Sequence, residues 1–448
     1  MRKPYIEFIL LGLLCLPCAV YAEEAERATS WGAWLKERVM YDGQILPMVT
    51  WQQPADSPQN PDNALMKLDS LNAAVHVRPN FAFRAGAISL GIRPRLIAEY
   101  TEIQDGLYDG DSDSTIDVFV NEGYAEWRVL PSFVVSAERR NLQWGSGFIT
   151  SPSNPFYRVT GKSRPQQELP GKDFVIASLI PNDLFSLTAI MNFGEGEAEI
   201  EGNRESFKQT YALKATFTFD DFSLSPVVSY QDDDRLRVGG FGSWTATDAG
   251  VLFFDASFAK GSNGRYVTPV DGDPFGMAFE TTKDDDGRIY SEILVGGAYT
   301  FESGATLTGE YLYYGEGYDK DEANDYYELI NRSGAAFAYQ GDDPMQQQLR
   351  QLGARNLYYS LQNNLAFRGQ HYATLYANRS DLWDTLDLTG GGTMNLADQS
   401  FYAFFNSSLN LVDSLDTFLN LLAYSQKDET EYQGVFDYMV TFGFTWYF

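Results

Sequence analysis

The feature that most constrains this chain is an alternation of apolar and polar residues with a period of two. In the segment 71–83 the odd positions are mainly apolar and the even positions are Asn, Ala, His or Arg, and segments 88–99 and 207–219 repeat the alternation. Successive side chains of a β-strand point to opposite faces of the sheet, so each segment predicts a strand with one apolar and one polar face. A barrel that meets hydrocarbon outside and water inside requires this arrangement.

The end of the chain is the most specific part of this pattern. Its apolar positions resemble the C-terminal signature by which outer-membrane barrels are recognised for assembly, and the resemblance implies the barrel-assembly machinery and periplasmic chaperones as partners. Closure of the last strand against the first removes the exposed edge that such an apolar strand otherwise presents. The six positions are Tyr438, Val440, Phe442, Phe444, Trp446 and Phe448.

Turn-forming residues divide the body of the chain into about eighteen predicted strands. The predicted fold class is all-β: a transmembrane, antiparallel, up-and-down β-barrel with short periplasmic turns and long extracellular loops. Sixteen strands remain an alternative, because some segments alternate weakly. The predicted strands are 38–51, 67–84, 87–102, 115–129, 133–144, 173–180, 184–193, 207–219, 222–231, 235–244, 250–259, 288–300, 304–314, 354–366, 370–380, 399–411, 414–425 and 434–448.

Strand parity decides the assignment of the last third of the chain. A barrel whose two ends both lie in the periplasm has an even number of strands, and we predict that the strand at 354–366 meets a tight periplasmic turn at Arg368-Gly369. Residues 383–394 also alternate, but a strand there makes the number odd, so we assign 382–399 to an external loop. The preceding loop, 315–353, is predicted to hold short helices near 321–331 and 344–352.

The first residues have the organisation of a secretory signal peptide, with a basic start, an apolar run and small residues before Ala22. We predict a signal peptide at 1–22 that is cleaved after Ala22, a short periplasmic segment at 23–37 and the barrel at 38–448. This organisation predicts a location in the cell outer membrane. Cys15 and Cys18 fall in the signal peptide, so the mature chain is expected to contain no disulfide.

The charge balance and the scarcity of histidine exclude several classes of function. The chain carries 33 Lys and Arg against 61 Asp and Glu, a net charge of −28, which excludes a nucleic-acid partner. Its two histidines are His76 and His371, and neither an HExxH nor a GxSxG motif occurs. We therefore predict a protein that is not an enzyme and has neither a cofactor nor a metal ligand. An outer-membrane hydrolase built around His371 is kept as a third alternative.

One stretch resembles a pattern found in a broad group of porin-like outer-membrane proteins. The pattern joins a basic strand at 138–143 to a Trp-Gly-x-Gly corner at Trp144, an Asn-Pro element at Asn154 and a Pro-Gly pair at Pro170. The resemblance implies a large barrel with one elaborate external loop at 145–172. A more distant likeness to alginate-export and capsule-associated barrels implies a strongly basic pore, and this chain departs from it because its polar strand faces also carry acids.

The polar strand faces supply the side chains that we expect to line the lumen. Charged rings in a pore select solutes by charge and dipole. Pairing across neighbouring strands is the alternative role for any one of these residues. The predicted pore-lining residues are His76, Arg78, Arg84, Arg93, Arg95, Glu122, Glu126, Arg128, Arg140, Lys208, Lys214, Arg235 and Arg237.

The loop at 145–172 is the best candidate to fold inward and narrow the pore, because its four prolines limit its freedom. A surface lid packed over the rim is the alternative. The predicted constriction residues are Arg158, Lys162, Arg164 and Glu168, and the three basic ones are expected to face Glu122 and Glu126.

These sequence features point to two functions from different classes. The first is a porin that lets small polar or charged solutes diffuse through a charge-lined lumen. The alternative is a non-conducting surface barrel, or a polysaccharide-export or assembly barrel, whose lumen is plugged by the loops at 145–172 and 315–353. Membrane lipid and lipopolysaccharide are expected neighbours in both cases, and the oligomeric state stays open.

Overall fold

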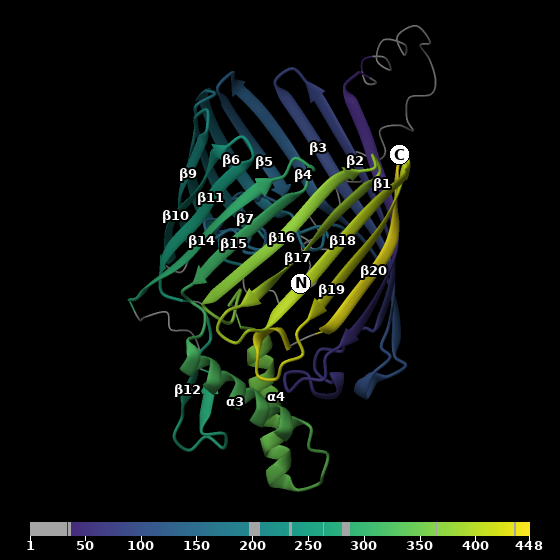
Figure 1. Cartoon of the computed structure of the whole chain (residues 1–448), viewed down its shortest axis with the longest axis vertical. Coiled ribbons are helices and arrows are strands. Elements are labelled where there is room, and N and C mark those ends of the chain that lie inside the picture. The colour runs from purple at the N-terminus through teal and green to yellow at the C-terminus, as the bar shows by residue number, and fades with distance from the viewer. Residues whose placement is uncertain are drawn as a thin grey trace, which may run out of the picture.

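The chain forms one closed antiparallel β-sheet of 18 strands in the computed structural model (Figure 1). Each barrel strand pairs with its neighbours in the chain, and β1 pairs with β20 to close the ring. This confirms the predicted fold class. The structure describes Trp34 and residues 37–196, 207–232, 235–262, 264–279, 287–363, 365–433 and 436–448, so the predicted signal peptide lies outside the described residues.

The strands agree with the predicted positions except in one region. They are β1 (Val39–Pro54), β2 (Leu71–Ala85), β3 (Ile88–Glu102), β4 (Ser112–Leu130), β5 (Phe133–Arg140), β6 (Lys172–Asn182), β7 (Phe185–Gly194), β8 (Thr210–Thr218), β9 (Phe222–Gln231), β10 (Arg235–Thr247), β11 (Gly250–Lys260), β14 (Ile289–Thr300), β15 (Thr306–Tyr314), β16 (His371–Leu382), β17 (Leu386–Asn395), β18 (Phe401–Val412), β19 (Leu415–Tyr424) and β20 (Phe436–Tyr447).

The connections differ in length between the two ends of the barrel. The end at the top of Figure 1, which we call the turn end, has short turns, whereas the other, the loop end, has the long connections. The predicted alternation is present in the strands: Val75 and Phe81 are 40% and 45% exposed on the outside, whereas His76 and Arg78 are 8% and 3% exposed on the inside. The barrel exterior is therefore apolar and its lumen polar.

The predicted strand at 354–366 is wrong, because this segment belongs to helix α4 (Pro344–Leu361). The Asp343 side chain caps the first turn by accepting a hydrogen bond from the Met345 backbone N–H, and Pro344 occupies a position that helix starts favour. The buried residues Gly353, Asn356, Leu357 and Ser360 have the spacing of one helix face.

The predicted external loop at 382–399 is also wrong, because it contains strand β17. Its three glycines suggested a loop, yet Gly391 lies opposite Tyr376 in the β16–β17 register, where a Cβ atom has no room against the neighbouring strand. The tight turn that follows β16 is therefore at 383–385, and Arg368-Gly369 lies at the loop end instead. The two errors cancel, so the strand number is as predicted.

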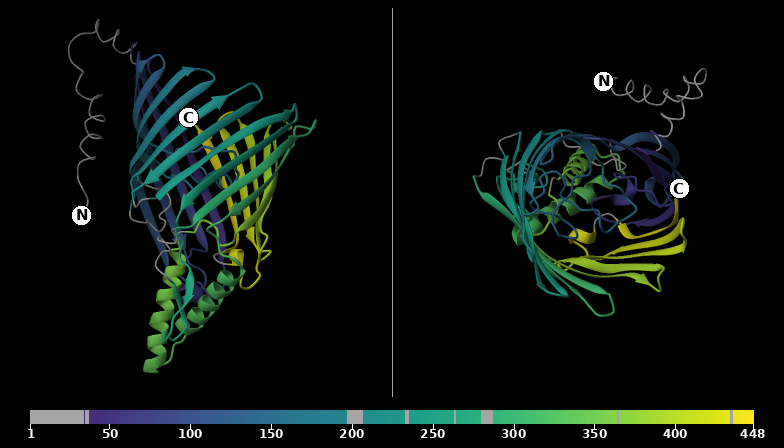
Figure 2. Two further views of the ribbon diagram at one scale, coloured as in Figure 1. Left: turned by 90° about the vertical axis from the view of Figure 1, so that its left-hand side faces the viewer. Right: turned by 90° about the horizontal axis from the view of Figure 1, so that it is seen from above.

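The long connections build a cap that projects from the loop end (Figure 2, left). Helices α3 (Lys320–Phe337) and α4 pack together and against the two-stranded ribbon of β12 (Val267–Pro269) and β13 (Met277–Phe279). Tyr326, Leu329 and Leu357 are at most 1% exposed in the core of this cap. Among the described residues, no helix combines the length and apolar character needed to cross a membrane.

Candidate constriction of the lumen

The connection between β5 and β6, residues 141–171, lies inside the barrel, and we call it the crossing loop. Its first part is anchored by aromatic packing. Phe156 makes edge-to-face contacts with Trp144 and with Phe174 of β6, at 5.7 and 5.0 Å between ring centroids. These rings belong to a buried cluster that reaches Val227 in β9. Burial of large aromatic side chains gives the loop a fixed seat on this wall.

Phe148 carries the crossing loop to the other side of the barrel. Its ring lies 4.2 Å from that of Tyr376 in β16 and 4.9 Å from that of Phe404 in β18. Its backbone N–H donates to both carboxylate oxygens of Glu310 in β15, at 2.9 and 3.1 Å. The loop therefore spans the lumen rather than covering its rim.

A second buried carboxylate, that of Asp255 in β11, also holds the crossing loop. Asp255 is 0% exposed. It accepts hydrogen bonds from the Ser151 hydroxyl at 2.6 Å and from the Ser153 backbone N–H at 2.7 Å. Arg237 of β10 donates to the Pro152 carbonyl oxygen at 3.2 Å. Sequence reasoning missed Asp255 and Glu310, because nothing local marks a strand acid as the partner of a distant loop.

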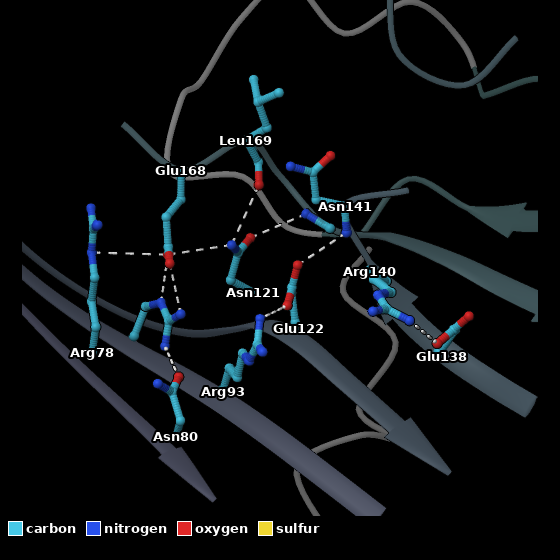
Figure 3. A network of polar contacts seen from close by, with 12 residues as sticks. Arg78, Asn80, Arg93, Asn121, Glu122, Glu138, Arg140, Asn141, Glu168 and Leu169 are labelled. Atoms are coloured by element: carbon cyan, nitrogen blue, oxygen red, sulfur yellow. Dashed lines mark hydrogen bonds and ion pairs between the residues drawn. The ribbon is translucent and has the colours of Figure 1, made fainter. Parts of the chain in front are cut away.

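The second part of the crossing loop meets β2 and β3 through charged groups (Figure 3). Glu168 accepts two hydrogen bonds from Arg95, at 2.5 and 2.7 Å, and lies 3.9 Å from Arg78. Arg78 also donates to the Gln166 carbonyl oxygen at 2.9 Å. Burial acts to raise the pKa of Glu168, but the hydrogen bonds from Arg95 and the charges of Arg78, Arg95 and Arg93 hold it below its usual range.

A β-bulge in β4 directs one more side chain at this segment. The register between β3 and β4 shifts between Arg93 and Pro94, which leaves Asn121 unpaired in the ladder. Asn121 accepts a hydrogen bond from the Gly171 backbone N–H at 3.1 Å and donates to Glu168 at 3.4 Å. The next residue, Glu122, pairs with Arg93 and accepts a hydrogen bond from the Asn141 backbone N–H, as Figure 3 shows.

The three cations of the loop have other contacts than those expected. Arg158 donates to the Tyr314 hydroxyl in β15 at 3.4 Å, and Arg164 donates to the Tyr424 hydroxyl in β19 at 3.3 Å. Lys162 donates to the Gly147 carbonyl oxygen at 2.8 Å. Burial lowers the pKa of Lys162, and the charge of Glu310 partly offsets that effect. Of the acids that these cations were expected to face, Glu122 lines one cavity together with Lys162, whereas Arg158 and Arg164 contact tyrosines of β15 and β19.

The other predicted lining residues lie inside the lumen or near one of the two ends of the barrel. Arg237 lies 3.5 Å from Glu292, Arg235 pairs with the buried Glu316, and the Lys214 ammonium lies 4.8 Å from the Trp144 ring centroid. His76 is within hydrogen-bond distance of Arg78. Arg140 lies 3.5 Å from Glu138. Glu126 is opposite Ser136 in the β4–β5 register. Arg84 and Arg128 are exposed towards the turn end, and Lys208 precedes β8.

Two cavities border the second part of the crossing loop, and a third lies among β1 to β4 without touching it. One of about 470 Å³ lies towards the loop end, between loop residues 163–167 and strands β1, β2, β3, β19 and β20. A second, of about 250 Å³, lies between the loop and β4 and is lined by Glu122, Lys162 and Glu168. A third, of about 240 Å³, lies towards the turn end between β1 and β4 and is lined by Arg84 and Arg93. The charged contacts of Figure 3 stand between the first and the third.

Comparison with known proteins supports the fold but does not identify the function. No family model and no curated protein matches the chain. Among solved structures it is similar to OprD of Pseudomonas aeruginosa, with 11% identity over 92% of this chain and 95% of that chain and a TM-score of 0.51. It is equally similar to OccK5 (OpdH) of Pseudomonas aeruginosa, with 11% identity over 92% and 99% of the two chains and a TM-score of 0.51. The chain therefore has the architecture of large porin-like barrels.

Proposed function

We propose that this protein is an outer-membrane channel through which small polar or charged solutes diffuse. The path runs along β1 to β4, between these strands and the second part of the crossing loop. The residues that select solutes are Arg78, Arg93, Arg95, Glu122 and Glu168, with Asn121 and Gln166 as uncharged partners.

The single observation that carries this proposal is the set of three cavities inside the barrel, two beside the crossing loop and one between β1 and β4 towards the turn end. Three arginines and two glutamates form ion pairs beside these cavities. Facing charges at a narrow point create a local field that favours some solutes over others without any chemical step. The apolar exterior and the architecture shared with porin-like barrels support a place in the outer membrane, among lipid and lipopolysaccharide.

Reconstitution into a planar lipid bilayer tests the proposal. The purified full chain is expected to give discrete single-channel steps in salt solution. A reversal potential measured across a salt gradient then reports the ratio of cation to anion permeability. Protein that inserts into the bilayer and yet gives no steps at any applied voltage contradicts the channel.

One observation favours a second candidate, a plugged and non-conducting barrel. The crossing loop has hydrogen bonds or ring contacts with strands on opposite walls, including β3, β11, β15 and β18. A distant likeness to alginate-export and capsule-associated barrels belongs with this candidate, which predicts no conductance in the native chain. Conductance that appears only after removal of loop residues 160–168 is the result that favours it.

A further inference from the structure

The 470 Å³ cavity at the loop end contains two carboxylates on one wall. Asp69 lies two residues before β2, and Glu99 lies in β3, where it accepts a hydrogen bond from the Asn72 side chain. Burial raises the pKa of Asp69, and the negative charge of Glu99 raises it further. Both carboxylates line the same cavity.

Among the residues that the structure describes, no ion pair reaches Asp69 or Glu99. The side-chain oxygen of Asn420, which lines the same cavity, is buried and accepts no hydrogen bond from a described group. On this wall the two carboxylates carry charge without an ion pair, and an ammonium group, which is positive and has three donors, complements them.

The rest of the cavity wall limits the kind of molecule that fits. Ile97, Leu422 and Met439 form an apolar part of the wall, and they suit a short aliphatic chain. Arg164 of the crossing loop lies on the wall away from β2 and donates to the Tyr424 hydroxyl. A solute with an ammonium group at one end therefore meets opposite charge at Asp69 and Glu99, and its other end points towards the crossing loop.

We propose that this cavity is a binding site for solutes that carry an ammonium group on a short aliphatic chain, with the ammonium held between Asp69 and Glu99. The role of the site in transport rests on the proposed channel function. Its occupancy does not, because equilibrium binding requires no conductance.

Titration calorimetry on the detergent-solubilised full chain tests the site with butylammonium as the probe. The native chain is expected to bind it with a dissociation constant of about 1 mM or below. Asp69→Asn and Glu99→Gln each keep the shape of the side chain and remove its charge, and each is expected to weaken binding about fivefold or more. Asp117→Asn is the matched control, because Asp117 is an exposed acid outside the cavity, and it is expected to bind like the native chain.

Further ligands distinguish the part of the probe that is recognised. Butyrate, which lacks the ammonium group, is expected not to bind, whereas 4-aminobutyrate shows whether Arg164 accepts a carboxylate at the other end. Unchanged butylammonium affinity in both cavity variants overturns the proposal, as does a native chain that binds no butylammonium. Binding without single-channel steps contradicts the channel function alone, so the two failures are distinguishable.

Discussion

The two parts of the crossing loop are held in the barrel by different forces. Residues 142–157 are seated by buried rings and by hydrogen bonds to Asp255 and Glu310, and they leave little space against the wall. Residues 160–169 meet their wall through charged and polar groups with cavities between them. The first part therefore fixes where the loop lies, and in the proposed channel the second part is expected to set which solutes pass.

The largest effect is expected from a change in the packed part. Phe156→Ala removes a ring that is 5% exposed and contacts both Trp144 and Phe174. A buried Phe→Ala replacement costs about 3–5 kcal/mol, so the loop is expected to loosen while the closed sheet remains. Limited proteolysis of the loop and open-channel current noise measure this. A loop as protease-resistant as the native one contradicts the assigned role of the packing.

A smaller effect is expected from the charged part. Glu168→Gln leaves Arg78 and Arg95 without their shared carboxylate. The permeability ratio is expected to move towards anions by about tenfold, which corresponds to ~1.4 kcal/mol at the narrow point. The reversal potential in a salt gradient measures the ratio. An unchanged ratio means that solutes do not pass beside Glu168.

The pH dependence of the permeability ratio also tests whether Glu168 controls selectivity. The pKa of Glu168 is lowered, so its charge and the stability from its pairing are fully present above the usual carboxyl range and are lost as the pH falls through the lowered value. Native selectivity is therefore expected to change at a lower pH than exposed carboxyls titrate. Reversal potentials across a pH series measure this change. In the control variant Glu168→Gln, which has no carboxyl group at this position, the low-pH change in selectivity is expected to be absent.

The smallest effect is expected at Arg140, which lies 3.5 Å from Glu138 and whose side chain is 58% exposed. Water screens the exposed Arg140, whereas the Glu138 side chain is only 7% exposed, so Arg140→Gln is expected to cost about 1 kcal/mol of stability and to alter selectivity less than Glu168→Gln does. Thermal unfolding in detergent and reversal potentials measure the two quantities. If Arg140→Gln changes the permeability ratio as much as Glu168→Gln does, the residues that select solutes lie nearer β5 than we propose.

Much of the fold was predictable, because period-two alternation is a local property that each strand carries by itself. Alternation alone does not separate a helix with close aromatic residues from a strand, which is why 354–366 was misassigned. It also cannot show why a strand carries glycines, because the reason for Gly391 is the neighbouring Tyr376.

The candidate site was predictable only in part, for a related reason. The charged residues of β2 to β4 follow from strand parity, and the inward position of the loop was among the alternatives. The contacts that place the loop join residues 104 and 162 positions apart, and no local pattern pairs Ser151 with Asp255 or Phe148 with Glu310. The loop cations were expected to face Glu122 and Glu126, whereas the fold gives Arg158 and Arg164 partners in β15 and β19.

The seam between β1 and β20 bears on how quickly this protein folds. Gly43 and Phe448 exchange two backbone hydrogen bonds across this seam. The side-chain hydroxyls of Thr50 and Thr441, which are 391 positions apart, also form a hydrogen bond there. Contacts between such distant segments form slowly, because the intervening chain has to be ordered first. Until then β1 and β20 each have one unpaired edge, the state in which sheets associate with other chains. The longer the chain remains without the β1–β20 pairing, the more of it is therefore expected to aggregate.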